Sequence, residues 1–419
     1  MKILIFHPSG NTNVRAIVKG FLTSGILYQF HTSIAVFPNN FWHKISNLKG
    51  LEDLNRRSFD PGLQDLTKVY PTKELGRMLA SKLGLNFFTK SETGYFCVDS
   101  IYHNLDRKIS KELKSAKSKG LTAVYAYEDG ALETFKVAKK LGLGCIYDLP
   151  IAYHVLLQEL LHEEAIRKPN WAFTLGGGIN DSDIKLERKK KELELADTIV
   201  VASDFVRHSL PSWAKGKKII QSPFGTPFSS NQIELIKKSS GNKLRILFVG
   251  SMTQRKGLSD LFDAMKIVDI SKVELVVLGS LAAPISFYND QIQFTYEPTR
   301  SNAKVLELMR TCDIFCLPSI VEGRALVIQE AMSQGLPIII TSNTGAEDLV
   351  VTEETGFLVP IRSPEAIAEK INWFLANRSK IFQMGKKAKQ LADTYTWEKY
   401  ATTICRELSS NSNYFTKSL

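Results

Sequence analysis

The chain has 419 residues, of which 44% are hydrophobic and 23% charged, and a formal net charge of +11. This length is too great for one comfortable core, so two domains of about 200 residues are expected in a composition ordinary for a soluble globular protein. Its longest apolar runs, such as residues 336–340, are strand-sized, which excludes a membrane-spanning helix. The first run breaks at His7 and is too short for a signal peptide, and five scattered cysteines indicate no disulfide framework. We therefore expect a cytoplasmic protein.

The first half alternates strand-like and helix-like segments. The expected strands are residues 3–7, 28–37, 121–127, 145–148 and 198–202, and the expected helices are residues 14–22, 132–141, 152–167 and 184–196. Residues 39–93 fit no simple alternation, so we expect an insertion that covers a cleft. Residues 222–227, rich in Ser, Pro and Gly, are the best candidate for a linker.

Basic residues gather on two predicted helices of this half. In the first, apolar residues recur every four positions from Ile101 to Leu113, and five lysines between 108 and 119 lie largely off that stripe. In the second, Lys185, Arg188, Lys189, Lys190 and Lys191 precede an apolar pair. A solvated helix face and attraction to an anionic membrane surface both explain this charge. Nucleic acid is a weaker partner, because no binding motif accompanies the charge.

The second half alternates more clearly. The expected strands are residues 244–249, 273–278, 292–295, 313–317, 337–341 and 356–359, with helices at 257–268, at 302–311 and from 325 until Gly335 caps the last one. This pattern predicts a doubly wound parallel sheet in each half. Ligands of such sheets bind beyond the carboxyl ends of the strands.

Two carboxylates straddle the predicted strand-to-helix turn after residue 317. Glu322 lies in the loop, and Glu330 lies eight positions later on the helix. The leading amides of that helix are free to bind an anion. A ligand with hydroxyl groups at both ends and phosphate in the middle, such as a nucleotide sugar, suits this arrangement.

Arg255 and Lys256 follow the strand that ends before Gly250, where a diphosphate in the cleft would lie. Arginine offers a two-pronged fork and lysine a point charge, and together they oppose a doubly charged group. An ordinary basic helix start is the alternative, but cations at that end oppose the helix dipole.

From residue 243 to about 407 the chain resembles the donor half of a retaining glycosyltransferase of family 4, with the two-Rossmann GT-B architecture. The residues that carry this resemblance are Gly250, Arg255-Lys256-Gly257, Pro318-Ser319, Glu322-Gly323, Glu330-Ala331-Met332, Gly335-Leu336-Pro337 and residues 356–360. The first half is more loosely similar, through residues 193–203 and the linker. The implied domains are an acceptor-side domain (1–222), a linker (223–242), a donor domain (243–395) and a helix crossing back to the first domain (396–419).

The resemblance implies roles for the donor-side residues. Glu330 would accept both ribose hydroxyls, and Glu322 would face the sugar near its C3 hydroxyl. Arg255 and Lys256 would neutralise the leaving diphosphate, with Gly250, Gly323 and Ala325 lining the same site. Positions 324 and 325 are usually an aromatic and a small residue in the family, whereas this chain has Arg324 and Ala325. Arg324 would then add a phosphate contact or pair with Glu322.

The acceptor side carries fewer signals. Many relatives place a histidine at the end of the strand corresponding to residues 145–148, where this chain has Asp148, and His154 follows in the next helix. We keep both as acceptor-side candidates, together with Gly10 after the first strand, where the backbone can approach a ligand. The trio of residues 181–183 precedes a helix and is explained by capping, so we expect no required metal.

These observations predict a retaining, hexosyl-type glycosyltransferase that takes a UDP- or GDP-sugar to a glycan, lipid or small-molecule acceptor without a cofactor. Two alternatives stay open. One is an epimerase or phosphorylase of the same fold, and the other is a non-catalytic nucleotide-sugar-binding scaffold. The expected location is the cytoplasm, with peripheral contact to an anionic membrane through the basic helices as a further hypothesis. The sugar, base, acceptor and oligomeric state do not follow from the sequence.

Overall fold

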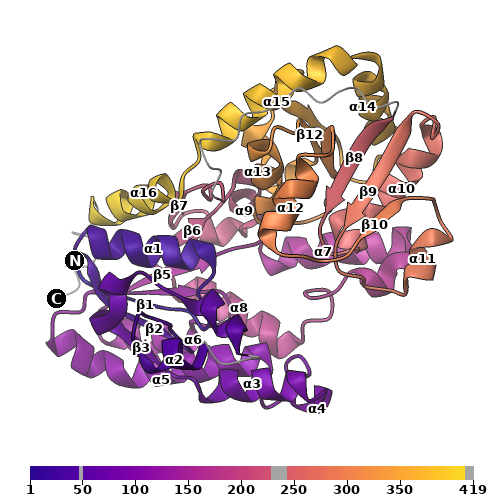
Figure 1. Ribbon diagram of the computed structural model, residues 1–419. Helices are drawn as coiled ribbons and strands as arrows, with labels where there is room; N and C mark the ends of the chain where they lie inside the picture. Colours follow the sequence, from indigo (N-terminus) through magenta and orange to yellow (C-terminus); the bar gives the residue numbers. More distant parts are fainter. Residues whose placement is uncertain (47–50, 228–242, 411–419) are drawn as a thin grey trace.

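Two parallel sheets divide the chain into two α/β domains that lie side by side (Figure 1). The computed structural model describes residues 1–46, 51–227 and 243–410. Residues 228–242 of the predicted linker lie outside the described residues. The predicted fold class, two Rossmann-like sheets, is confirmed.

The first sheet has the order β3-β2-β1-β4-β5-β6-β7, and all of its strands are parallel. Its strands are β1 (Ile3–Phe6), β2 (Leu27–Thr32), β3 (Thr67–Val69), β4 (Ala123–Tyr127), β5 (Gly144–Leu149), β6 (Thr198–Val201) and β7 (Lys218–Gln221). The central strands are buried on both faces, as continuous apolar runs dictate. The two edge strands were not predicted, because three or four residues with an exposed face carry a weak signal.

Helices cover both faces of this sheet. They are α1 (Thr12–Thr23), α2 (Phe41–Ser46), α3 (Thr72–Lys82), α4 (Asn86–Thr89), α5 (Val98–Ser118), α6 (Leu132–Lys140), α7 (His154–Arg167), α8 (Asp183–Leu195) and α9 (Asp204–Ser209), with short turns η1 (Glu52–Arg57), η2 (Pro61–Leu66), η3 (Pro169–Thr174) and η4 (Ser212–Ala214). Helices α5, α6 and α8 pack on one face. The segment expected as an insertion, 39–93, contains the edge strand β3 as well as helices.

The second sheet has the order β10-β9-β8-β11-β12-β13 and is also parallel. Its strands are β8 (Leu244–Val249), β9 (Val273–Leu278), β10 (Thr295–Glu297), β11 (Ile314–Leu317), β12 (Ile338–Ile340) and β13 (Gly356–Leu358). The strand expected at 292–295 begins at Thr295 instead and follows a short helix. A single hydrophobic cluster fills this domain.

The helices of the second half surround that sheet. They are α10 (Leu258–Ile267), α11 (Ile285–Asn289), α12 (Asn302–Met309), α13 (Leu326–Ser333), α14 (Pro364–Ala376), α15 (Arg378–Asp393) and α16 (Trp397–Ser409), with turns η5 (Gln254–Lys256), η6 (Ser342–Thr344) and η7 (Glu347–Leu349). No helix in residues 1–46, 51–227 or 243–410 is long and apolar enough to cross a membrane.

Besides the chain between β7 and β8, two further segments cross from one domain to the other. Helix α16 returns to the first domain, where it lies beside α1 and covers the second face of the sheet (Figure 1). A Cβ at Gly20 would come 2.6 Å from the Cβ of Ala401, so the two helices approach closely. In the opposite direction, α7 and η3 leave the carboxyl end of β5 and reach the second domain, where Trp171 joins the core. Both domains therefore share residues in their cores.

Candidate functional site

The loop between β11 and α13 is held by close backbone approaches. A Cβ at Gly257 would lie 1.9 Å from the oxygen of Pro318, and Gly257 has a φ of 72°. Only glycine fits there, so the η5 turn sits directly against the end of β11. Helix α13 ends at Ser333, and Gly335, which follows the C-cap residue, has a φ of 82°, the predicted left-handed conformation. This packing brings the η5 turn and the Glu322 loop together.

Arg255 and Lys256 both contact the carboxylate of Glu322. Arg255 Nη1 lies 3.0 Å and Lys256 Nζ 2.6 Å from Oε1 of Glu322. Burial lowers the pKa of Lys256, while the Glu322 charge opposes that shift. A Cβ at Gly250 would touch the Lys256 stem at 3.7 Å, so the end of β8 forms the floor beneath it. Four predicted donor-side residues thus lie together.

Glu330 lies one turn and a half into α13, half-buried, on the side facing α12. Its Oε1 accepts a hydrogen bond from Asn302 Nδ2 at 2.8 Å. Burial raises the pKa of this carboxyl, and the Asn302 hydrogen bond partly offsets the effect. Glu330 retains acceptor capacity for further donors. At the start of the same helix the Ile328 amide donates to the Ala325 carbonyl at 3.0 Å, and the two amides before it have no intrahelical partner.

Arg324 is placed away from the expected contacts. Its Nη1 lies 2.8 Å from Asp348 Oδ1, and its side chain is 1% exposed. The guanidinium also donates to Gln329 Oε1 at 3.0 Å and lies over the Tyr395 ring. The predicted salt bridge with Glu322 is not formed, since Glu322 pairs with Arg255 and Lys256. Nη2 of Arg324 is buried without a hydrogen-bond partner, and the predicted phosphate contact stays a prediction.

The Glu322 loop also contacts the first domain. A Cβ at Gly323 would come 1.8 Å from the oxygen of Pro150, which follows β5. Ser203 Oγ donates to the Gly323 carbonyl at 2.6 Å. Ala325, buried, is the N-cap of α13, and its amide donates to Thr344. The donor-side loop therefore lies at the domain junction.

On the first domain, His7 ends β1 at the carboxyl edge of the sheet. Its Nε2 lies 2.9 Å from the Tyr102 hydroxyl, and burial lowers its pKa to about 4. Gly10 follows, and a Cβ there would come 2.3 Å from the ring of Phe59, so packing explains this glycine. From the sequence, His7 was predicted only as the last residue of a strand.

A second group at this edge is a cluster of four acidic residues and two lysines. The sequence did not predict it. We call it the acceptor-edge cluster; its members are Asp99, Glu128, Asp129, Asp181, Lys185 and Lys189. Lys189 Nζ lies 3.1 Å from Asp181 and 3.7 Å from Glu128. Burial raises the pKa of Glu128 to about 7. Glu128 Oε1 and Asp129 Oδ1 are buried without a hydrogen-bond partner, which points to a polar ligand. The sequence signal that could have indicated this cluster is Glu128-Asp129-Gly130, directly after β4.

The basic side chains of α8 form ion pairs within the protein, whereas the sequence predicted a solvated or membrane-facing helix. Lys185 and Lys189 turn inward to the acceptor-edge cluster, and Arg188 pairs with Asp106 at 2.6 Å. Lys190 and Lys191 each pair with a glutamate of the same helix. Ser182 caps α8 through the Lys185 amide, as the sequence predicts. This helix offers little free positive charge to a membrane.

His154 begins α7 beside this cluster. Both ring nitrogens are buried without a hydrogen-bond partner, and burial and the Lys189 charge lower its pKa to about 4. A neutral imidazole with two unsatisfied nitrogens is suited to a polar ligand. Asp148 differs, because it lies 3% exposed within the sheet, where Tyr125 donates to its Oδ2 at 2.5 Å. Asp148 is a core residue in this structure.

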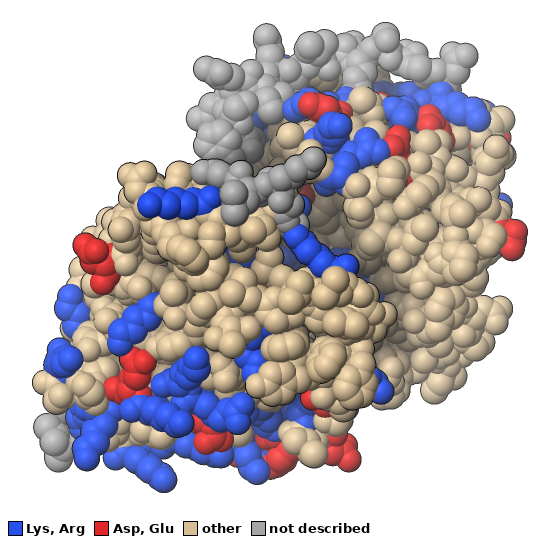
Figure 2. Space-filling model, turned by 60° about the horizontal axis from the view of Figure 1, so that its bottom comes forward, with Lys and Arg blue, Asp and Glu red and all other residues tan. Residues whose placement is uncertain are grey.

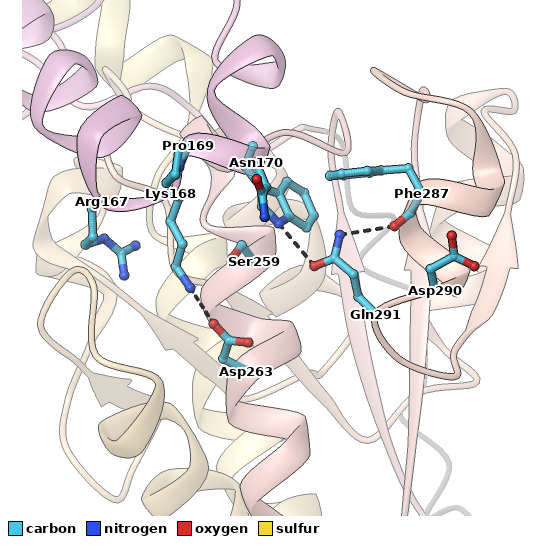
Figure 3. A pocket seen from close by; sticks show the side chains of 10 residues that line it. Arg167, Lys168, Pro169, Asn170, Ser259, Asp263, Phe287, Asp290 and Gln291 are labelled. Carbon is cyan, nitrogen blue, oxygen red and sulfur yellow. Dashed lines mark hydrogen bonds and ion pairs between the residues drawn. The ribbon is translucent and has the colours of Figure 1, made fainter.

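A cavity of about 510 Å³ lies where η3 meets α10 and α11 (Figure 3). Lys168 Nζ crosses it to Asp263 at 2.5 Å, and Trp171 Nε1 donates to Gln291 at 3.1 Å. Neither Arg255, Glu322 nor Glu330 lines it, so this cavity is separate from the predicted donor site. Within the described parts of the chain, no group of three or more His, Cys, Asp or Glu side chains is arranged to hold a metal ion.

Comparison with known proteins matches residues 231–391 to the family model described as glycosyl transferases group 1. One curated relative is the capsular polysaccharide biosynthesis glycosyltransferase CapM of Staphylococcus aureus, 30% identical over 53% of this chain and 63% of CapM. Another is the sulfoquinovosyl transferase SQD2 of Arabidopsis thaliana, 23% identical over 59% of this chain and 48% of SQD2. The chain thus spans 63% of the length of CapM and 48% of the length of SQD2.

Solved structures are similar over nearly the whole chain. Sucrose-phosphate synthase of Thermosynechococcus elongatus has a TM-score of 0.63 at 18% identity, covering 98% of this chain and 100% of that one. HepE of Anabaena, solved with UDP, has a TM-score of 0.59 at 16% identity with the same coverage. At this identity the likeness shows the fold alone. Residues 231–391 therefore match the model of the glycosyl transferases group 1, within a chain that has the GT-B fold throughout its two domains.

Proposed function

We propose that this protein is a retaining glycosyltransferase. It would move a hexosyl group from a UDP- or GDP-sugar to a glycan, lipid or small-molecule acceptor without a metal. The observation that carries the proposal is the meeting of Arg255 and Lys256 at Glu322, beside the helix that bears Glu330. Two cations, helix amides and two carboxylates match the charges and hydroxyls of a nucleotide sugar.

The roles of the donor-side residues follow from their chemistry. Arg255 and Lys256, with the amides at the start of α13, oppose the charge that grows on the leaving diphosphate. Gly250 and Gly323 keep the backbone close to it. Glu322 faces the sugar, and Glu330 accepts from the ribose hydroxyls. Because Glu322 holds both cations, it also sets their positions before the donor arrives.

In the proposed reaction, the bond between the anomeric carbon and the diphosphate oxygen breaks while the acceptor oxygen bonds to the same carbon from the same face. The acceptor proton passes to the departing phosphate oxygen, so atoms and charge balance. No paired nucleophile and acid are then needed. His154 and the acceptor-edge cluster would orient the acceptor hydroxyl, because they offer unpartnered polar atoms at the carboxyl edge of the first sheet.

The test is thermal stabilisation by nucleoside diphosphates and their sugars in a chelator-treated buffer, comparing wild type with Arg255→Ala and Glu330→Ala. A ligand at a hundredfold excess over Kd stabilises by about 2.7 kcal/mol, which is a visible rise in Tm. One base should stabilise the wild type and neither variant. No rise with any nucleotide would overturn the proposal.

A second assay separates the alternatives. Release of nucleoside diphosphate only in the presence of an acceptor supports transfer. Release of nucleoside diphosphate, or conversion of the donor, without an acceptor supports an epimerase or phosphorylase. Donor binding without turnover, across a panel of acceptors, would favour a scaffold.

A further inference from the structure

Helix α3 has the reverse of the usual amphipathic pattern. Its Glu74 is 4% exposed and pairs inward with Arg57 and with Arg77 at 2.7 Å. Leu79 and Leu83, at one face of the helix, are 59% and 62% exposed. A surface helix normally turns its leucines to the core and its carboxylates to water. The outward leucine stripe of α3 therefore has no partner within the described part of the chain.

The exposed apolar surface continues beyond α3. Its members are Leu75, Leu79, Leu83, Leu85, Phe87, Phe88, Tyr95 and Val98, of which Phe87 is 82% exposed. Ring contacts join the aromatic members, since the ring of Phe88 lies 5.6 Å from that of Phe87 and 6.1 Å from that of Phe96, which in turn lies 4.9 Å from that of Tyr95. A contiguous exposed patch of this kind marks an interaction site, whereas single exposed apolar residues are ordinary. We call it the α3–α4 apolar patch.

Within residues 72–119, the exposed charged side chains have one sign. Every fully exposed charged side chain between residues 72 and 119, all of which the structure describes, is basic: Lys82, Lys90, Arg107, Lys111, Lys114, Lys117 and Lys119. The acids of this stretch are withdrawn, because Asp99 and Asp106 are buried and Glu92 and Glu112 are only partly exposed. Glu92 accepts from Ser182, and Glu112 from Tyr70. Figure 2 brings this side of the molecule forward and shows Lys and Arg side chains gathered over its lower part, with Asp and Glu side chains among them.

We propose that the α3–α4 apolar patch and the exposed lysines of α5 form a docking surface for an anionic lipid bilayer. Leucine and phenylalanine side chains enter the boundary between headgroups and acyl chains, and flanking lysines pair with anionic headgroups. A protein partner would need acidic and apolar groups together to match this surface. A bilayer supplies both, with the anionic layer directly outside the apolar one.

The same segment is tied to the acceptor edge of the first domain. Glu92, in the loop after α4, accepts from the Ser182 amide at 3.0 Å. Asp99, one residue into α5, pairs with Lys185 of the acceptor-edge cluster at 3.1 Å. A docked patch therefore brings that edge close to the bilayer. Resting on the proposed transferase function, this placement favours an amphiphilic acceptor whose polar head extends from the membrane.

The experiment is flotation of the full chain with phosphatidylcholine vesicles, with and without about 30% phosphatidylglycerol. The test variant is Leu79→Ser/Leu83→Ser/Phe87→Ser, and its matched control is Ile267→Ser/Ile270→Ser, which removes exposed apolar side chains from the second domain. Wild type and control should float with the anionic vesicles, and the test variant should bind at least about tenfold more weakly. A Lys111→Gln/Lys114→Gln variant should lose binding mainly to the anionic vesicles.

Equal binding by the test variant and wild type, or no binding of wild type to anionic vesicles, would overturn the proposal. So would a wild-type dimer that the test variant abolishes, because the patch would then bind a second copy. Thermal stabilisation by nucleotide is measured on the same samples. It should be equal in all of them, which confirms folding, and it keeps failure of membrane docking distinct from failure of the transferase proposal.

Discussion

Glu164 of α7 accepts a hydrogen bond from Gln254 Nε2 at 2.7 Å, although the two residues belong to segments of different domains. Glu164 is fully buried and also pairs with Arg167 and Arg362. Gln254 directly precedes Arg255 and Lys256, and its side chain also reaches Asp260 at 3.0 Å. The position of the donor-side cations is therefore fixed by a carboxylate that lies outside the site itself.

Glu164→Ala should weaken nucleoside diphosphate binding about tenfold, because the η5 turn loses its support, and should destabilise the protein by about 3–5 kcal/mol, since two arginines lose a buried partner. Calorimetric titration and thermal unfolding measure the two effects. Glu163→Ala is the matched control, because Glu163 is the neighbouring residue, is half exposed and pairs with the same Arg362. Equal nucleotide affinity in wild type and Glu164→Ala would contradict this coupling.

Substitutions at the two ends of the donor site should affect the binding of different ligands. Arg255→Ala and Lys256→Ala should weaken a nucleoside diphosphate about 10- to 100-fold and leave the free nucleoside almost unaffected, because they act on phosphate charge. Glu330→Ala should weaken both ligands to a similar degree, since ribose is common to them. Titration of each variant with nucleoside and nucleoside diphosphate gives the comparison. A loss of nucleoside binding in Arg255→Ala would place that residue elsewhere in the site.

Asp129→Asn should reduce transfer to the acceptor without changing donor affinity. Asp129 holds a φ of 68°, which non-glycine residues rarely adopt, and its Oδ1 is buried without a partner. We expect kcat/KM for the acceptor to fall about tenfold or more, because a carboxylate that accepts from a hydroxyl becomes a weaker amide acceptor. Asp181→Asn serves as the comparison, since each of its carboxylate oxygens already pairs with a lysine, Oδ1 with Lys185 and Oδ2 with Lys189. An unchanged kcat/KM in Asp129→Asn would remove the acceptor-edge cluster from the site.

The sequence predicted the central strands, the strand–turn–helix around Glu322 and the neighbourhood of Gly250, Arg255 and Lys256, because long apolar runs and glycine breaks are local signals. It did not predict the acceptor-edge cluster. That cluster joins residues from α5, the β4 end and α8, which are separated by up to 90 positions, and only the sheet order brings them together.

The distribution of charge along the sequence was the least informative signal about where side chains lie in the structure. The lysines of α8 looked like those of α5 along the sequence, yet Lys185 and Lys189 are turned inward and Lys114 is exposed. A basic helix does not reveal which of its neighbours carry buried carboxylates. Arg324 shows the same limit, because its partner Asp348 comes from a turn 24 residues away.

Asp148→Asn should stabilise the protein at neutral pH. Burial raises the pKa of Asp148 to about 7 in the folded chain. A carboxyl with a raised pKa contributes stability that is full below its unfolded value near 4 and is lost as the pH rises through about 7. Relative to wild type, the asparagine variant should therefore gain up to about 4 kcal/mol between pH 4 and pH 8.

Thermal unfolding at both pH values measures this gain, and Tyr125 can still donate to the amide oxygen. Asp290→Asn, on an exposed turn, is the control for loss of one negative charge. A Tm difference between wild type and Asp148→Asn that is the same at pH 4 and pH 8 would contradict the raised pKa.

Arg324→Ala should reduce stability and leave donor binding intact. The Arg324 guanidinium donates to the Gly345 carbonyl at 3.0 Å and to Gln329, whose own Nε2 donates to the Phe224 carbonyl at 3.1 Å. This chain of hydrogen bonds joins the Glu322 loop to the segment that connects the domains. Its removal leaves buried acceptors without donors, which costs about 2–4 kcal/mol.

Thermal unfolding of Arg324→Ala should therefore show a Tm several degrees below wild type. The nucleoside diphosphate Kd should stay within about twofold, since the Arg324 guanidinium is engaged by Asp348, Gly345 and Gln329 rather than by Glu322. Asp348→Ala, which removes the exposed end of the same ion pair, should have the smaller effect on Tm because Gly345 and Gln329 still bind the guanidinium. A large rise in Kd for Arg324→Ala with little change in Tm would return Arg324 to the donor site.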